Sequence, residues 1–240
     1  MQFGLFSVSD ITTDPTTGTT PTEHERIKAI VQIAKKAEDI GLDVFALGEH
    51  HNEPFFSSSP TTTLAYIAAQ TERLQLSTAT TLITTNDPVK IAEDFAMLQH
   101  LADGRVDLML GRGNTGPVYP WFGKDIRDGI PLAIENYALL RRLWNEENVT
   151  WEGKFRTPLQ GFTSTPRPLD DIAPFVWHGS IPAPRSRSRP PTTVTVSSTT
   201  TSSGRRSTPR RWCSSTGSAS STTVTAGRRT RSSASVGRCS

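Results

Sequence analysis

Apolar runs of strand length alternate with stretches of helical periodicity along the first 181 residues of this chain. The runs are "MQFGLFSV" at the N-terminus, "DVFALGEHH" from Asp43, "LQLSTATTLI" from Leu74, "VDLMLG" from Val106 and "APFVWHGS" from Ala173. The stretches between them predict helices from Thr20 to Gly41, over 60–72, from Pro88, and from Leu132 to Trp144. Strands separated by helices favour a parallel sheet with helices packed on it.

Two local patterns refine this scheme. The first helix is predicted to open at Thr20, with Pro21 at its first position and Glu23 closing a capping box. The segment "NVTWEGKFRTPLQGF", residues 148–162, predicts an inserted hairpin between the last helix and the last strand.

Polar and charged residues follow the ends of four predicted strands. They are Glu49, His50 and His51 after the second, Thr84, Thr85, Asn86 and Asp87 after the third, Arg112 and Asn114 after the fourth, and His178 and Ser180 after the fifth. An open doubly wound sheet concentrates such residues at one switch point. A (β/α)₈ TIM barrel carries them at the carboxyl ends of many strands. The pattern favours the barrel, an α/β fold, of which residues 1–181 supply about five strands.

Three motifs carry a resemblance to a known family. "GEHH" ends the second strand, "TTNDPVKIAEDFAMLQHLADGRVDLMLGRGN" runs from the third strand through the fourth, and "PFVWHGSI" covers the fifth. Together they resemble the flavin-dependent, bacterial-luciferase-like monooxygenases, particularly an actinobacterial FMN-dependent branch. The resemblance covers residues 1–181. It implies a (β/α)₈ barrel that binds reduced FMN, or in sister groups a deazaflavin, and uses O₂ to oxidise a small organic substrate. It also implies a flavin reductase as partner and a homodimer for an intact version.

The resemblance also implies roles for individual residues. His50 corresponds to the catalytic histidine over the flavin, where an imidazole titrating near neutral pH can donate or accept a proton. The implied cofactor-binding residues are Ala79 and Thr80 under the isoalloxazine ring, Arg112, Gly113 and Ser180 at the phosphate, and Asn114. A flavin phosphate needs a fixed cation and hydrogen-bond donors, which this set contains. His51 and Trp121 are the expected residues of the substrate pocket, and Phe122, the neighbour of Trp121 in "YPWFG", is a further candidate for its lining.

Without the resemblance, other interpretations of these residues stay open. A histidine pair after a strand also serves as a structural pair, and Arg112 also fits a salt bridge. "GRGN" lacks the third glycine of a dinucleotide fingerprint and is typical of a tight turn. Trp121 and Phe122 suit core packing equally well. No metal site is expected, because HExxH is absent and no third ligand has diagnostic spacing. The alternative enzyme is a deazaflavin-dependent oxidoreductase that transfers hydride without O₂.

The composition changes abruptly near residue 182. Residues 1–181 hold all 23 Asp and Glu against 15 Lys and Arg, whereas residues 182–240 hold 11 Arg and no Lys, Asp, Glu, Leu, Ile or Phe. Ordering a backbone costs about 1–2 kcal/mol per residue, and this segment has little to bury in return. A disordered Ser/Thr/Arg-rich tail is therefore expected. A nucleic-acid-binding arm is the rival function, but Lys is absent and Trp212 is the single aromatic residue of the segment.

Neither a signal peptide nor an apolar run of about 18 residues occurs in the sequence. A cytoplasmic protein without a membrane partner is expected.

The tail is interpreted as a frame-shifted translation. If each true codon joins the third base of one codon to the first two of the next, Thr codons become those of Tyr, His, Asn or Asp. Residues 190–205 then admit "AAYYGDGFFHNNIFWP", which has the strand and loop character that the family shows after its fifth strand. As written, five strands cannot close a barrel and leave unpaired edges. The chain is therefore expected to fold poorly and to have little activity.

This interpretation predicts an insertion or deletion in the DNA near codon 182. Resequencing the gene across this region checks it directly, and an intact, uninterrupted frame would contradict it.

Overall fold

The computed structural model describes residues 2–178, together with Val194–Thr195 and Thr223–Val224. Residues 2–178 belong to one compact unit built on a five-stranded sheet in the order β1-β2-β3-β4-β7. The strands are β1 (Gly4–Ser7), β2 (Val44–Leu47), β3 (Gln75–Leu82), β4 (Asp107–Gly111) and β7 (Phe175–His178). Every neighbouring pair in this sheet is parallel, as the alternation of strands and helices predicts.

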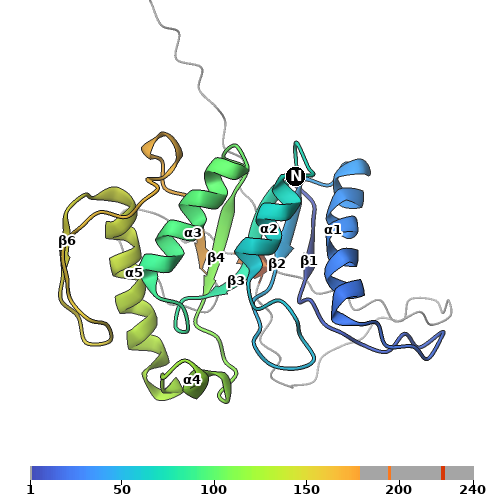
Figure 1. Ribbon diagram of the computed structural model, residues 1–240, viewed down its shortest axis with the longest axis horizontal. Helices are drawn as coiled ribbons and strands as arrows, with labels where there is room; N and C mark the ends of the chain where they lie inside the picture. The colour runs from blue at the N-terminus through green and yellow to red at the C-terminus, as the bar shows by residue number, and fades with distance from the viewer. Residues whose placement is uncertain (1, 179–193, 196–222, 225–240) are drawn as a thin grey trace, which may run out of the picture. The chain divides into compact units, whose positions relative to one another are not determined.

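Four long helices accompany the sheet. They are α1 (Glu23–Asp39), α2 (Pro60–Ala68), α3 (Pro88–Leu101) and α5 (Gly129–Asn145). Figure 1 shows these four helices side by side over one face of the sheet. A short helix, α4 (Val118–Trp121), and two 3₁₀ turns at Ile126–Asp128 and Leu169–Asp171 were not predicted from the sequence. None of the helices in the described ranges combines the length and the hydropathy that crossing a membrane requires.

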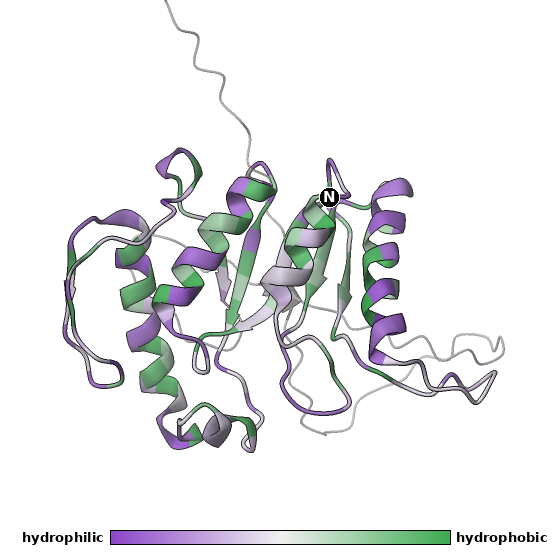
Figure 2. Ribbon diagram, in the orientation of Figure 1, coloured by the Kyte–Doolittle hydropathy of each residue, from purple (hydrophilic) through white to green (hydrophobic). Residues whose placement is uncertain are grey.

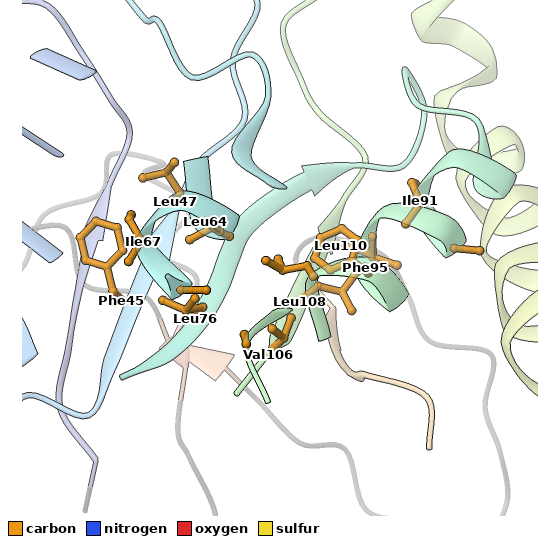
Figure 3. Close-up of a cluster of buried hydrophobic side chains, with 14 of the residues drawn as sticks. Phe45, Leu47, Leu64, Ile67, Leu76, Ile91, Phe95, Val106, Leu108 and Leu110 are labelled. Carbon is orange, nitrogen blue, oxygen red and sulfur yellow. The ribbon is translucent and has the colours of Figure 1, made fainter. Parts of the chain in front are cut away.

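The core lies between this sheet and its helices. Phe45 and Leu47 of β2, Leu76 of β3, and Leu108 and Leu110 of β4 are fully buried. These strand residues belong to one buried cluster with Leu64 and Ile67 of α2 and with Ile91 and Phe95 of α3 (Figure 3). The helices carry hydrophobic residues on one side and hydrophilic residues on the other (Figure 2). Burial of these alternating strand residues fixes which face of the sheet the helices cover.

The start of α1 differs from the prediction by a few residues. Thr22, not Thr20, is the N-cap, and Glu25, not Glu23, closes the capping box. The Glu25 N–H donates to Thr22 Oγ1 (3.3 Å), and the Thr22 N–H donates to a carboxylate oxygen of Glu25 (2.8 Å). Because this reciprocal pair satisfies two backbone donors at the helix end, the spacing from Thr22 to Glu25 determines where the helix begins.

The predicted hairpin is present. β5 (Val149–Trp151) and β6 (Leu159–Phe162) pair antiparallel after α5, outside the main sheet. The predicted tail, residues 182–240, lies outside the described residues apart from β8 (Val194–Thr195) and β9 (Thr223–Val224), which pair antiparallel with each other.

Removing a buried ring from the helix layer tests this packing. Phe95 of α3 is 1% exposed, so Phe95→Ala is expected to lower the free energy of unfolding by about 3–5 kcal/mol. Met97 lies on the same helix but is 50% exposed, and Met97→Ala is expected to change it by about 0.5 kcal/mol or less. Urea unfolding followed by circular dichroism measures both. Equal losses for the two variants would contradict the described core.

Candidate functional site

A cavity of about 200 Å³ opens where β2, β3 and β4 end. Its walls come from the ends of these strands and the segments that follow them. β2 is followed by Glu49–Asn52, β3 and its loop contribute Ala79, Thr80, Leu82, Thr84 and Thr85, and the end of β4 contributes Gly111–Thr115. Val118 and Tyr119 of α4 complete the lining. Since the three strands are parallel neighbours, their carboxyl ends meet at one edge of the sheet. The cavity therefore lies where strand ends of a barrel carry functional residues.

Most of the residues singled out from the sequence meet in this cavity. His50, His51, Ala79, Thr80, Arg112, Gly113 and Asn114 all line it. Ser180 lies outside the described residues. Trp121 is not among the lining residues and is 61% exposed. The role of Trp121 in a substrate pocket stays a prediction. The chemical roles of the residues that do line the cavity stay predictions.

Phe122, the neighbour of Trp121, makes the contact with the site instead. Its ring meets that of His51 edge-on, with the ring centroids 4.6 Å apart. The short helix α4 ends at Trp121, and Phe122 is its C-cap. Sequence alone gave no signal for choosing between these two rings.

His178 also departs from the expectation that strand ends deliver their polar residues to one site. It pairs in register with Leu110, which belongs to the buried core. Its ring packs edge-on against Tyr137 of α5, with centroids 4.6 Å apart. His178 therefore faces the helix layer rather than the cavity, because residues opposite each other on neighbouring strands share a face.

A buried carboxylate stands at the back of the cavity. Glu49 is 4% exposed and accepts three hydrogen bonds. The Leu82 N–H donates to Oε2 (2.9 Å), whereas the Asn86 side-chain amide (2.8 Å) and His51 Nε2 (2.9 Å) both contact Oε1. Glu49 was noticed in the sequence as a residue at a strand end, but its burial depends on loops that fold over it. No pattern in the sequence predicts that burial.

His50 is half-buried and its ring is held by stacking. It lies against Phe55 with ring centroids 4.1 Å apart and planes inclined by 21°. The His50 N–H donates to the carbonyl oxygen of Ser57 (2.9 Å), which ties the loop after β2 to the chain ahead of α2. Burial lowers the pKa of His50 because it disfavours the charged imidazolium. The nearby Glu49 charge opposes this change, and His51 adds to it.

Arg112 brings a guanidinium to the cavity from the end of β4. Its carbonyl oxygen accepts hydrogen bonds from the Thr84 hydroxyl (2.6 Å) and the Tyr119 hydroxyl (2.6 Å), so its backbone is held from two sides. The next residue, Gly113, has a φ of +70°, a conformation that favours glycine. Within the described part of the chain, the Arg112 guanidinium makes no ion pair. The side chain is thus free to bind an anion.

The floor of the cavity is a close contact between β3 and β4. The peptide bond between Ala79 and Thr80 is cis. A Cβ atom on Gly111 would come within 2.3 Å of Thr80 Oγ1, so a larger residue cannot replace this glycine without a shift of the backbone. Gly111, the first glycine of "GRGN", is therefore favoured by the close contact between β3 and β4. Gly113, the second, is favoured by its positive φ.

The histidines and acids of the described ranges do not assemble a metal centre. Groups of three or more His, Cys, Asp or Glu side chains placed to hold one ion are absent there. The polar side chains that line the cavity are two imidazoles, several hydroxyls, two amides, the Glu49 carboxylate and one guanidinium.

Comparison with known proteins gives one consistent family. The sequence profile of luciferase-like monooxygenases matches residues 1–189. The chain is 33% identical over 119 residues to the uncharacterized protein YwcH of Bacillus subtilis, covering 47% of this chain and 36% of that protein. It is 31% identical over 162 residues to the F420-dependent glucose-6-phosphate dehydrogenase of Kineococcus radiotolerans, covering 62% of this chain and 46% of that protein. The matched part therefore spans less than half the length of either relative.

Solved structures give the same result for the fold. The monooxygenase RslO1 from Streptomyces bottropensis is 28% identical with a TM-score of 0.66, over 74% of this chain and 53% of that chain. The FMN-bound oxygenating constituent of 3,6-diketocamphane monooxygenase from Pseudomonas putida is 18% identical with a TM-score of 0.66, over 74% of this chain and 51% of that chain. These likenesses confirm the predicted fold class, with five parallel strands of the luciferase-like barrel described here.

The lowered pKa of His50 predicts a pH dependence of stability. The unfolded chain takes up a proton near the ordinary value of 6.5, whereas the folded chain does so at lower pH. Between the two pKa values the unfolded state binds more protons, so the free energy of unfolding falls as pH drops through this window and is fully retained above it. His178, whose pKa burial also lowers, contributes in the same direction.

An NMR titration, with His50→Gln to assign the signal, measures this directly. We expect the His50 midpoint below 6.5, and a weaker loss of stability in acid for His50→Gln. A midpoint at or above 6.5 would show that the ring is not desolvated as described.

Proposed function

Because this chain belongs to the luciferase-like monooxygenase family, we propose that its site binds reduced FMN and oxidises a small organic substrate with O₂. One observation carries the proposal. The cavity at the ends of β2, β3 and β4 brings the histidine pair, the Ala79–Thr80 segment and an Arg112 guanidinium without an ion pair into one space. A flavin reductase supplies the reduced cofactor, and an intact version of the protein forms a homodimer.

Arg112 and its neighbours suit the phosphate of FMN. A phosphate monoester carries close to two negative charges near neutral pH and binds best to a fixed cation surrounded by hydrogen-bond donors. Arg112 supplies the cation, and Gly113 and Asn114 follow it in the same wall. The hydroxyls of Thr85 and Thr115 line the cavity as further donors. Ser180 completes this set in the proposal.

The other wall suits the reacting end of the cofactor. Reduced FMN, when bound, supplies the activation of O₂, which no side chain can perform. His50 has a lowered pKa and is therefore neutral at pH 7, so it can accept a proton from a bound group. The stacked Phe55 ring holds the His50 ring in place. The Ala79–Thr80 backbone forms the surface against which a flat ring system would lie.

A deazaflavin is the second candidate cofactor. The F420-dependent dehydrogenase of Kineococcus radiotolerans matches this chain over a longer stretch than YwcH does. An F420-dependent secondary alcohol dehydrogenase shares the fold with a TM-score of 0.59 at 21% identity. With a deazaflavin the site would transfer hydride without consuming O₂. Oxygen uptake measured with each reduced cofactor separates the two reactions.

The chain as written is proposed to hold its cofactor weakly. The described cavity, at about 200 Å³, is smaller than the roughly 300–1,000 Å³ of typical sites for organic ligands. An eight-stranded barrel surrounds its site with the ends of eight strands, whereas the described sheet has five strands. Residues 182–240 are proposed to be the product of a frame-shifted translation. Purification of the 240-residue chain as a yellow protein with stoichiometric FMN would contradict weak binding.

Replacing Arg112 tests the proposed phosphate contact. Arg112→Ala is expected to weaken FMN binding about tenfold or more, because a hydrogen bond to a charged group contributes about 1.5–3 kcal/mol. Riboflavin has the same ring system without the phosphate, and its affinity is expected to stay unchanged. Titrations that follow the quenching of flavin fluorescence measure both affinities.

Arg73→Ala is the matched control. Arg73 is exposed and lies just ahead of β3, at the amino end of the sheet, where its guanidinium donates to the Glu38 carbonyl oxygen. It is expected to bind FMN like the unchanged chain. An equal loss of FMN and riboflavin affinity in Arg112→Ala, or no loss of either, would contradict the phosphate site.

A further inference from the structure

The carboxylate of Glu49 connects the loop after β2 to the end of β3 and to the segment ahead of α3. It follows β2, and its acceptor oxygens contact His51 in the same loop, the Leu82 N–H at the end of β3, and the Asn86 amide ahead of α3. The Glu49 N–H also donates to the carbonyl oxygen of Thr80 (3.2 Å). The Glu49 carboxylate therefore has two kinds of partner. Leu82 and Asn86 are permanent hydrogen-bond donors, and His51 is an imidazole.

The Leu82 N–H and the Asn86 amide do not change their protonation state. A backbone N–H and an amide NH₂ can only donate, so Leu82 and Asn86 hold Glu49 as an acceptor whatever the state of the imidazole. A buried carboxylate without donors would lose its hydration with nothing to replace it, so these donors stabilise the charged form. The carboxylate is thus fixed in position with Oε1 directed at His51 Nε2, 2.9 Å away.

His51, in contrast, can exist in two neutral tautomers. With the proton on Nε2, the ring donates a hydrogen bond to Glu49 Oε1. With the proton on Nδ1, the Nε2 lone pair would face a carboxylate oxygen at 2.9 Å, which is repulsive. The edge-on contact with Phe122 and the low exposure of the side chain, 14%, limit rotation of the ring away from this contact. The carboxylate therefore selects the tautomer.

We propose that Glu49 is a positioning residue, which fixes His51 as the Nε2–H tautomer and leaves Nδ1 as the proton acceptor of a cavity-lining ring. In the described part of the chain, Nδ1 makes no hydrogen bond. A proton taken up there gives an imidazolium that stays hydrogen-bonded to Glu49. The site then contains two imidazoles with separate supports, His50 stacked on Phe55 and His51 bonded to Glu49. This second proton acceptor matters for catalysis only if the proposed function holds, but the tautomer does not depend on it.

Other charged groups near this pair do not compete for the same proton. Asp94 lines a small hollow on the far side of Glu49 and pairs with Lys90 on α3. Arg112 lines the cavity without an ion pair in the described ranges. His50, whose pKa burial lowers, interacts electrostatically with both members of the pair. Among the hydrogen-bond partners of the Glu49 carboxylate in the described ranges, His51 is therefore the group that can gain or lose a proton.

A purely structural role for Glu49 makes a different prediction. If the carboxylate only ties β3 to the loop after β2, its loss and the loss of Asn86 should have similar effects. Glu49→Gln keeps one acceptor, and when that oxygen faces the Leu82 N–H, its NH₂ group faces both His51 and Asn86. The Asn86 amide then turns its oxygen toward this NH₂ group, and His51 accepts through Nε2 and carries its proton on Nδ1. Asn86→Ala removes the amide bonds to Glu49 and to the Leu82 carbonyl oxygen and leaves the contact between His51 and Glu49 intact.

The ¹⁵N NMR spectrum of the full chain with ¹⁵N-labelled histidine reports the tautomer without any cofactor. Above the titration range, the unchanged chain is expected to show a protonated-type Nε2 and an unprotonated-type Nδ1 for His51, assigned with His51→Gln. In Glu49→Gln these two signals are expected to exchange, and in Asn86→Ala they are expected to stay in place.

Three results would overturn the proposal. They are an Nδ1–H tautomer in the unchanged chain, an unchanged tautomer in Glu49→Gln, and the same exchange of signals in Asn86→Ala. If Glu49→Gln fails to fold, the unchanged chain still decides the tautomer. Because no flavin is present, the outcome is separate from the FMN titrations: loss of FMN binding alone would reject the proposed function and leave the tautomer assignment standing.

Discussion

The parallel pairing of β2, β3 and β4 is the constraint on which the candidate site depends. It places three carboxyl strand ends at one edge of the sheet, and each end contributes a different kind of group. β2 leads into the glutamate and histidine pair, β3 into hydroxyls and a backbone surface, and β4 into a glycine turn with an arginine. The buried residues that fix the sheet against its helices, such as Phe45 and Leu108, hold these ends in register. The site is therefore a consequence of the fold and of only a few additional side-chain contacts.

Those additional contacts treat the acidic and the basic side chain of the site differently: the Glu49 carboxylate has hydrogen-bond partners, and the Arg112 guanidinium has no ion pair within the described residues. The anionic group is thus satisfied internally and the cationic group is available. His50 lines the same cavity, and burial lowers its pKa, which favours the neutral ring. A cavity whose guanidinium makes no ion pair within the described residues is suited to a ligand that carries an anionic group.

Sequence patterns predicted the parts of this arrangement that follow from periodicity. The five parallel strands, the long helices and the hairpin at 148–162 could be derived because apolar residues repeat at strand or helix spacing. The gathering of His50, His51 and Arg112 followed from their positions after strands. The direction of a side chain at a strand end could not be derived, because it depends on register: pairing with Leu110 turns His178 toward α5.

The burial of Glu49 beneath a loop could not be predicted from the sequence either. Glu49 was visible as a charged residue, but its importance comes from Leu82 and Asn86, which fold over it from another segment. Trp121 and Phe122 are adjacent in sequence and alike in chemistry, yet only the Phe122 ring contacts His51. The resemblance to a family supplied residue roles, whereas the contacts that hold those residues in place required the structure.

Hydrogen exchange with and without FMN, read by mass spectrometry, tests the central claim most directly. The account predicts slower exchange on addition of FMN in the segments that end β2, β3 and β4, namely residues 48–52, 79–86 and 111–115, and no change in α1 or the β5–β6 hairpin. Slower exchange confined to the hairpin or to residues 182–240, with the three strand ends unaffected at saturating FMN, would contradict it.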